Sequence, residues 1–169
     1  MRYAQIRKCD IANGAGIRTS LYVQGCSRHC KGCFNPETWG FEGGHLWTEE
    51  VEKKFLEFIG KPHIVGATIL GGEPLEPQSR EGVLTLVRKI KMKYPQKSIW
   101  IYSSYLYEEL VIEVPEIMAY IDVLVDGMFE EKLQDSSLRF RGSSNQRVID
   151  VPLSLKTGKV EKIKNIDKK

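Results

Sequence analysis

The chain has 169 residues, of which 41% are hydrophobic, and its formal net charge is +3. This length predicts one domain with a sizeable core, and the charge is too small to indicate nucleic-acid binding. The apolar runs are too short to span a membrane, and the N-terminal residues carry charge without the apolar segment of a secretion signal. We therefore expect a cytoplasmic protein with one domain over residues 1–155 and a basic C-terminal tail over residues 156–169.

The predicted elements alternate between strands and helices along the chain. Strands are predicted over residues 19–23, 64–70, 98–102, 121–125 and 148–151, and helices over residues 48–60, 79–94 and 105–111. Thr48 is a suitable N-cap for the first helix, and Pro95 ends the second. Elements that alternate in this way form right-handed crossovers and a parallel sheet. Because a full eight-stranded (β/α) barrel needs roughly 250 residues, we expect an α/β fold with an open, incomplete (β/α) barrel and a mostly parallel sheet.

Most of the cysteines lie in one loop, directly after the first predicted strand. Cys26, Cys30 and Cys33 have the spacing C-x3-C-x2-C, which allows their thiolates to converge on one metal centre. A closed zinc site uses four protein ligands, and a closed iron–sulfur cluster generally uses four cysteines. A triad therefore leaves one coordination position free for a group that is not protein.

Other interpretations of the cysteines are open at this point. A zinc site could be completed by Cys9, His29 or His45, because ligand spacing alone does not determine the metal. A disulfide with one odd thiol is disfavoured in a reducing cytosol. We expect Cys9 to be a small buried residue and His29 to lie on the surface of the loop, so that neither is a ligand.

Polar residues and glycines follow the next three predicted strands. Gly71-Gly72-Glu73-Pro74 ends the second strand, Ser103-Ser104 the third and Asp126-Gly127 the fourth. The carboxyl ends of parallel strands meet at one edge of a sheet, which is where ligands bind in such folds. Together with the cysteine loop, these residues outline one predicted site.

The cysteine spacing and the glycine–glutamate turn resemble those of the radical S-adenosylmethionine superfamily. The resemblance implies the incomplete barrel of that superfamily and a 4Fe-4S cluster on Cys26, Cys30 and Cys33. It implies in addition that the amino and carboxylate groups of S-adenosylmethionine bind the fourth iron atom, which no cysteine occupies.

The same resemblance implies which residues surround S-adenosylmethionine. The turn Gly71–Glu73 would approach the methionyl ammonium with its glycine backbone and orient it with its carboxylate. Ser103 or Ser104 would face ribose or carboxylate oxygens, and Asp126 would face the ribose or the ammonium. The backbone of Gly32–Phe34 would lie against the adenine.

Four segments are similar to those of glycyl-radical-enzyme activases, in particular the activases of an anaerobic ribonucleotide reductase: residues 13–18, 30–35, 126–129 and 141–147. This similarity implies that an electron from a flavodoxin-like donor cleaves S-adenosylmethionine and that a glycyl radical forms on the large subunit of the reductase. Alternatives are an activase of another glycyl radical enzyme such as pyruvate formate-lyase, or a small deazapurine-forming enzyme. From a different class, the alternative is a zinc-stabilised binding module.

The arginines within residues 139–147, with Trp39 and Trp47, are candidates for the surface that binds a protein partner. The alternative is that these arginines pair with acidic residues nearby and that the tryptophans pack against the domain.

Overall fold

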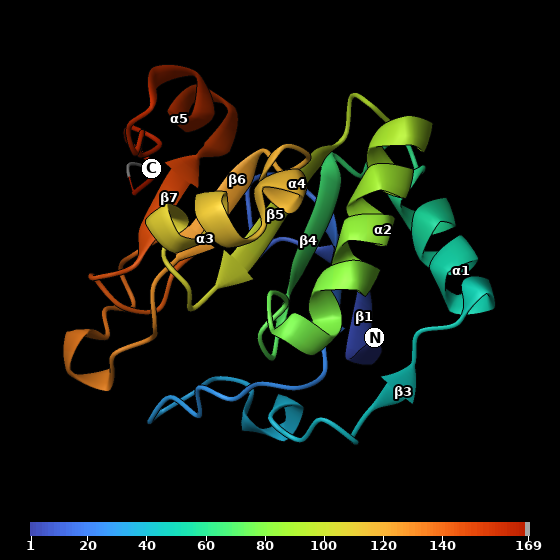
Figure 1. Ribbon diagram of the computed structural model, residues 1–169, viewed down its shortest axis with the longest axis horizontal. Helices are drawn as coiled ribbons and strands as arrows, with labels where there is room; N and C mark the ends of the chain where they lie inside the picture. Colours follow the sequence, from blue (N-terminus) through green and yellow to red (C-terminus); the bar gives the residue numbers. More distant parts are fainter. Residues whose placement is uncertain (168–169) are drawn as a thin grey trace.

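The computed structural model describes residues 1–167 as a seven-stranded sheet with helices along it (Figure 1). The strands are β1 (Arg2–Asp10), β2 (Arg18–Val23), β3 (His45–Leu46), β4 (Gly66–Gly71), β5 (Ser98–Ser103), β6 (Val123–Asp126) and β7 (Arg147–Asp150). The α-helices are α1 (Glu49–Ile59), α2 (Pro77–Lys93), α3 (Tyr107–Glu113), α4 (Pro115–Met118) and α5 (Val151–Thr157), and the 3-10 helices are η1 (Pro36–Thr38) and η2 (Glu131–Leu133). Lys168 and Lys169 of the expected basic tail lie outside the described residues.

The sheet is open and has the strand order β3-β1-β2-β4-β5-β6-β7. The prediction of an α/β fold with an open sheet is confirmed, and the four central strands β2, β4, β5 and β6 run parallel. The outer pairings β1–β3, β1–β2 and β6–β7 are antiparallel, so the prediction of a mostly parallel sheet is wrong outside the centre. A physical reason is the connection between β1 and β2, which is shorter than the crossover that parallel neighbours require.

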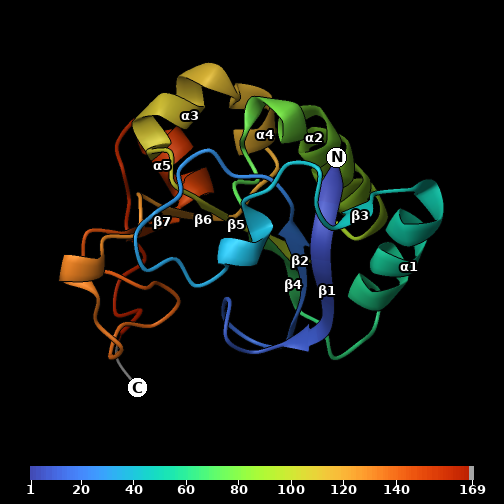
Figure 2. The same cartoon turned by 90° about the horizontal axis from the view of Figure 1, so that it is seen from below.

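Helices α1 to α4 cover one face of the sheet and enclose the main core (Figure 1). Ile69 of β4, Phe55 of α1 and Leu86 of α2 are fully buried there. Figure 2 shows the loop after β2 in front of the ends of the strands, and the segment between β6 and β7 on the side of the sheet away from α2, α3 and α4. The loops that follow β2, β4 and β5 meet at the lower edge of the sheet in Figure 1, and this edge carries the site.

Two element boundaries differ from the prediction for local reasons. Helix α2 begins earlier than expected, at Pro77, because proline is favoured in the first turn of a helix. The last strand ends at Asp150, because the Asp150 carboxylate caps α5 by accepting a hydrogen bond from the Leu153 backbone. Within residues 1–167, none of the helices combines the length and apolarity needed to cross a membrane.

Candidate metal and cofactor site

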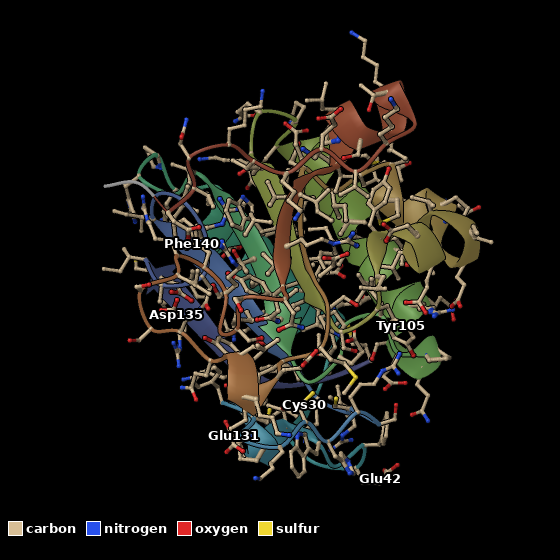
Figure 3. The ribbon with its side chains drawn as sticks, turned by 90° about the vertical axis from the view of Figure 1, so that its left-hand side faces the viewer. Cys30, Glu42, Tyr105, Glu131, Asp135 and Phe140 are labelled. Atoms are coloured by element: carbon tan, nitrogen blue, oxygen red, sulfur yellow. The ribbon has the colours of Figure 1, made fainter. Side chains whose placement is uncertain are left out.

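One cavity at the carboxyl edge of the parallel strands is lined by Cys26, Cys30 and Cys33, all from the loop after β2. Figure 3 shows Cys30 at this edge, with Tyr105 and Glu131 on either side of it in that view. The same cavity is lined by further residues that the sequence singles out: Phe34, Gly71, Gly72, Glu73, Ser103 and Ser104. The fold therefore brings the cysteine loop, the glycine–glutamate turn and the serine pair together.

Hydrogen bonds hold the cysteine loop in place from two sides. The backbone N–H of Cys26 donates to the Trp39 carbonyl at 3.0 Å. On the other side, the buried carboxylate of Glu76 accepts from the backbone N–H of Ser27 at 2.8 Å and from the Ser27 hydroxyl. Because Glu76 directly precedes α2, the position of the cysteine loop is tied to the start of that helix.

The turn after β4 passes so close to the cysteine loop that it requires glycine. The Gly72 N–H donates to the Val23 carbonyl at 2.9 Å, and the Glu73 N–H donates to the Gly25 carbonyl at 2.9 Å. A Cβ atom on Gly72 would lie 2.4 Å from the Gly25 carbonyl oxygen, and Gly71 has a φ of +108°, which L side chains rarely adopt. Packing between the two loops is therefore one physical reason for this glycine pair.

Glu73 is a buried carboxyl group with hydrogen-bond donors on both oxygens. Its Oε1 atom accepts from the Leu75 N–H at 3.0 Å and from the Ser103 hydroxyl at 2.8 Å. Its Oε2 atom accepts from the backbone N–H and the hydroxyl of Ser104, at 2.7 and 2.6 Å. Burial raises the pKa of the Glu73 carboxyl, against the opposing effect of these hydrogen bonds. No lysine or arginine of the described chain forms an ion pair with it.

Asp126 and Gly32 are predicted site residues that do not line this cavity. Asp126 is fully buried, and it accepts hydrogen bonds from Arg147 Nε at 2.9 Å and from the Tyr107 backbone N–H at 2.8 Å. Gly127, the next residue, does line the cavity. Asp126 thus fixes the end of β6, and the sequence could not show this because Arg147 is 21 residues away.

Sequence patterns did not indicate that Arg28, Trp39 and Tyr102 line the cavity. Each has a buried polar side-chain atom without a hydrogen-bond partner among the described residues: Nε of Arg28, Nε1 of Trp39 and the hydroxyl of Tyr102. The position of Arg28 between the first two cysteines is the one local signal that could have indicated it. The other two positions depend on how η1 and β5 pack, which no local pattern reveals.

The three cavity cysteines are free thiols. Burial raises the pKa of the Cys26 and Cys30 thiols, so binding of a metal centre has to release their protons. Within residues 1–167, no three His, Cys, Asp or Glu side chains are grouped so that they could hold a metal ion. A zinc ion needs four ligands around one point, whereas the thiolates of an iron–sulfur cluster bind different iron atoms.

The other residues considered as zinc ligands lie elsewhere. In the described chain, none of Cys9, His29 and His45 lines the cavity. The prediction that Cys9 is buried is wrong, because most of the C-terminal half of β1 is open to solvent, and the exposed Cys9 Sγ lies 3.8 Å from His63 Nε2. His29 is exposed on the loop, as predicted, and its ring stacks on Trp39 with 4.5 Å between centroids.

The arginine-rich segment makes ion pairs within the chain. Arg141 binds Asp167 at 2.6 Å, and Arg147 binds the buried Asp126. Trp47 packs edge-on against the ring of core residue Phe55, at 5.6 Å between centroids. These contacts agree with the alternative that the arginines pair with nearby acids and that tryptophan packs against the domain.

Residues 12–149 match the model of a protein family described as a 4Fe-4S single cluster domain. Three bacterial proteins are similar to the chain over nearly their whole length. The protein of Salmonella typhi is 41% identical over 150 residues, which are 88% of this chain and 97% of the relative. The protein of Vibrio cholerae is 40% identical over 148 residues, which are 86% of this chain and 96% of the relative. The protein of Escherichia coli is 39% identical over 150 residues, which are 88% of this chain and 97% of the relative. Each of the three is named anaerobic ribonucleoside-triphosphate reductase-activating protein.

The residues that line the cavity fit a 4Fe-4S cluster on structural grounds. Three free thiols on one loop line a common cavity, and thiolates are the usual ligands of such clusters. Arg28 and Trp39 line the same space, and each has a buried N–H donor without an acceptor among the described residues. The sulfur atoms of a cluster accept hydrogen bonds. The cavity thus offers both ligands and donors suited to a cluster.

Proposed function

Because the chain belongs to the family of anaerobic ribonucleoside-triphosphate reductase-activating proteins, we propose that it activates an anaerobic ribonucleotide reductase. The activation consists of forming a glycyl radical on the large subunit of that enzyme. The observation that carries this proposal is the single cavity lined by the three cysteines, the glycine–glutamate turn and the serine pair.

In this proposal Cys26, Cys30 and Cys33 hold a 4Fe-4S cluster by three of its iron atoms. When bound, the cluster supplies one electron, received from a flavodoxin-like donor, to split S-adenosylmethionine into methionine and a 5′-deoxyadenosyl radical, which takes a Cα hydrogen from the target glycine. Glycine suits this transfer because no side chain blocks access to its Cα atom. The chain contributes the orientation of both reactants and the exclusion of water.

Glu73 is the group that we propose to orient the methionyl ammonium. Its carboxyl group is buried and has no cationic partner in the described chain, so a bound ammonium would favour its ionised form. Ser103 and Ser104 fix both carboxylate oxygens and are proposed to hold the ribose or carboxylate end as well. For Asp126 we propose a supporting role, because it holds the end of β6 next to Gly127.

The backbone of Gly32–Phe34 is proposed to lie against the adenine, since Cys33 and Phe34 line the cavity. A second cavity of about 570 Å³ shares Phe34, Tyr102 and Gln146 with the first. We propose that the glycine-bearing loop of the reductase enters through this second cavity. An open sheet leaves room there for a loop that is part of a folded protein.

The test is to reconstitute the chain with iron and sulfide without oxygen, and to add the large reductase subunit, S-adenosylmethionine and reduced flavodoxin. Electron paramagnetic resonance should then show a glycyl radical doublet on the reductase, and the Cys30→Ala variant should give none. A parallel sample contains pyruvate formate-lyase in place of the reductase. If the doublet appears on pyruvate formate-lyase and not on the reductase, the proposed protein partner is wrong. If the parent chain binds one zinc ion and no iron, the whole proposal is wrong.

A further inference from the structure

Two residues that line the cysteine cavity have a buried hydrogen-bond donor without an acceptor in the described chain. Trp39 and Arg28 line this cavity. The Nε1 atom of Trp39 and the Nε atom of Arg28 are buried and have no partner among the described residues. Indole and guanidinium groups only donate hydrogen bonds. A buried donor without an acceptor is unfavourable, and an acceptor bound in the cavity that both residues line would remove this cost. Tyr102 is less informative, because its hydroxyl both donates and accepts.

The position of both donors is set by the cysteine loop. The Trp39 carbonyl accepts from the Cys26 N–H at 3.0 Å, and the Trp39 ring stacks on His29. Arg28 lies between the first two cysteines, and its guanidinium lies 4.1 Å from the centroid of the Tyr105 ring. Trp39 is therefore held against the cysteine loop, and Arg28 is part of it.

We propose that Trp39 and Arg28 donate hydrogen bonds to sulfur atoms of the cluster and thereby raise its reduction potential. This inference rests on the proposed function, because it requires a cluster on the three cysteines. Thiolate and sulfide sulfurs accept hydrogen bonds, and reduction adds a negative charge to them. A donor therefore stabilises the reduced cluster more than the oxidised one, and hydrogen bonds to the sulfurs are a known determinant of cluster potential.

The test compares Trp39→Phe with the matched control Trp47→Phe. Phenylalanine keeps an aromatic ring to stack on His29 and removes the N–H. In the control, the lost Nε1–H donates to Glu52 at 3.2 Å, away from the cavity. The midpoint potential of the cluster is measured by anaerobic titration, followed by electron paramagnetic resonance, without S-adenosylmethionine. We expect a lower potential for Trp39→Phe than for the parent chain, and the parent value for Trp47→Phe.

Arg28→Met supplies an independent measurement, in case Trp39→Phe does not retain the cluster. It removes a positive charge together with the donor, so the potential should again fall below that of the parent chain. Unchanged potentials in variants that hold full iron and sulfide would overturn this inference and leave the proposed function intact. A shift that appears only after S-adenosylmethionine is added would also overturn it, because the acceptor would then be the nucleotide. A parent chain without a cluster would overturn both.

Discussion

At the scale of single residues, the four cysteines divide into three that line the cavity and one that does not. We predict that Cys26→Ala, Cys30→Ala and Cys33→Ala each abolish cluster binding, because two thiolates do not hold a cluster that needs three. Cys9→Ala should keep the parent iron content, since Cys9 lies on the exposed face of β1. Iron and sulfide analysis after anaerobic reconstitution measures this. Full iron content in any of the first three variants would contradict the ligand assignment.

Glu76 is the residue that connects the cysteine loop to α2. Glu76→Ala removes the acceptor of two hydrogen bonds from Ser27, and hydrogen bonds to a charged group contribute about 1.5–3 kcal/mol each. We predict that this variant folds but loses iron to a chelator faster than the parent chain. The control is Glu81→Ala, an exposed position on the same helix. Equal rates of iron loss in both variants would show that Glu76 does not position the loop.

Residue types and spacing were enough to predict the thiols and the glycine–glutamate turn, because both are local patterns. They were not enough for Asp126, whose carboxylate is paired with Arg147 on another strand. They also could not reveal the unpaired donors of Arg28 and Trp39, because a missing hydrogen-bond partner is a property of the packed structure.

At the scale of elements, the contact between the turn after β4 and the cysteine loop depends on the missing side chain of Gly72. In Gly72→Ala the new Cβ would meet backbone atoms of Gly25 at 2.4 and 2.9 Å, and backbone cannot give way as the end of a side chain can. We predict a loss of about 1–3 kcal/mol in the free energy of unfolding, measured by urea denaturation, together with a lower cluster content.

The matched control for this prediction is Gly40→Ala. No atom lies within 4 Å of a Cβ at Gly40, so its effect on the free energy of unfolding should stay within about 0.5 kcal/mol. Equal losses in Gly72→Ala and Gly40→Ala would mean that the close approach of the two loops does not constrain the fold.

The elements that the sequence predicted are those with strong patterns, such as the apolar strand β4 and the amphipathic helix α1. The missed strand β1 has charged residues and a half-exposed burial pattern, so its strand conformation depends on pairing with β2 and β3. Helix α5 was missed although its signals are local, namely Asp150 as N-cap and a proline in the first turn.

At the scale of the whole molecule, Arg147 joins one end of the open sheet to the helical layer. It pairs with the fully buried Asp126 of β6 and with Glu108 of α3, and hydrogen bonds to these two carboxylates raise the pKa of the Arg147 guanidinium. Arg147→Ala would leave a buried carboxylate without its cation, which destabilises proteins by about 3–5 kcal/mol. Thermal and urea denaturation measure this loss.

The control is Arg88→Ala, which breaks an ion pair with Glu116 in which both side chains are exposed, by 45% and 67%. Such surface ion pairs contribute about 0–1 kcal/mol to the free energy of unfolding, so Arg88→Ala should lose no more than this. If the two arginine variants lose the same stability, the buried pair does not hold β6, β7 and α3 together.

The account as a whole depends on a cluster with one iron atom that no side chain of the chain binds. The most direct measurement is the electron paramagnetic resonance spectrum of the reduced cluster, recorded before and after S-adenosylmethionine is added. We predict that the g-values change on addition, because the amino and carboxylate groups of the nucleotide bind the free iron atom. A spectrum that stays the same at saturating S-adenosylmethionine would contradict the central claim.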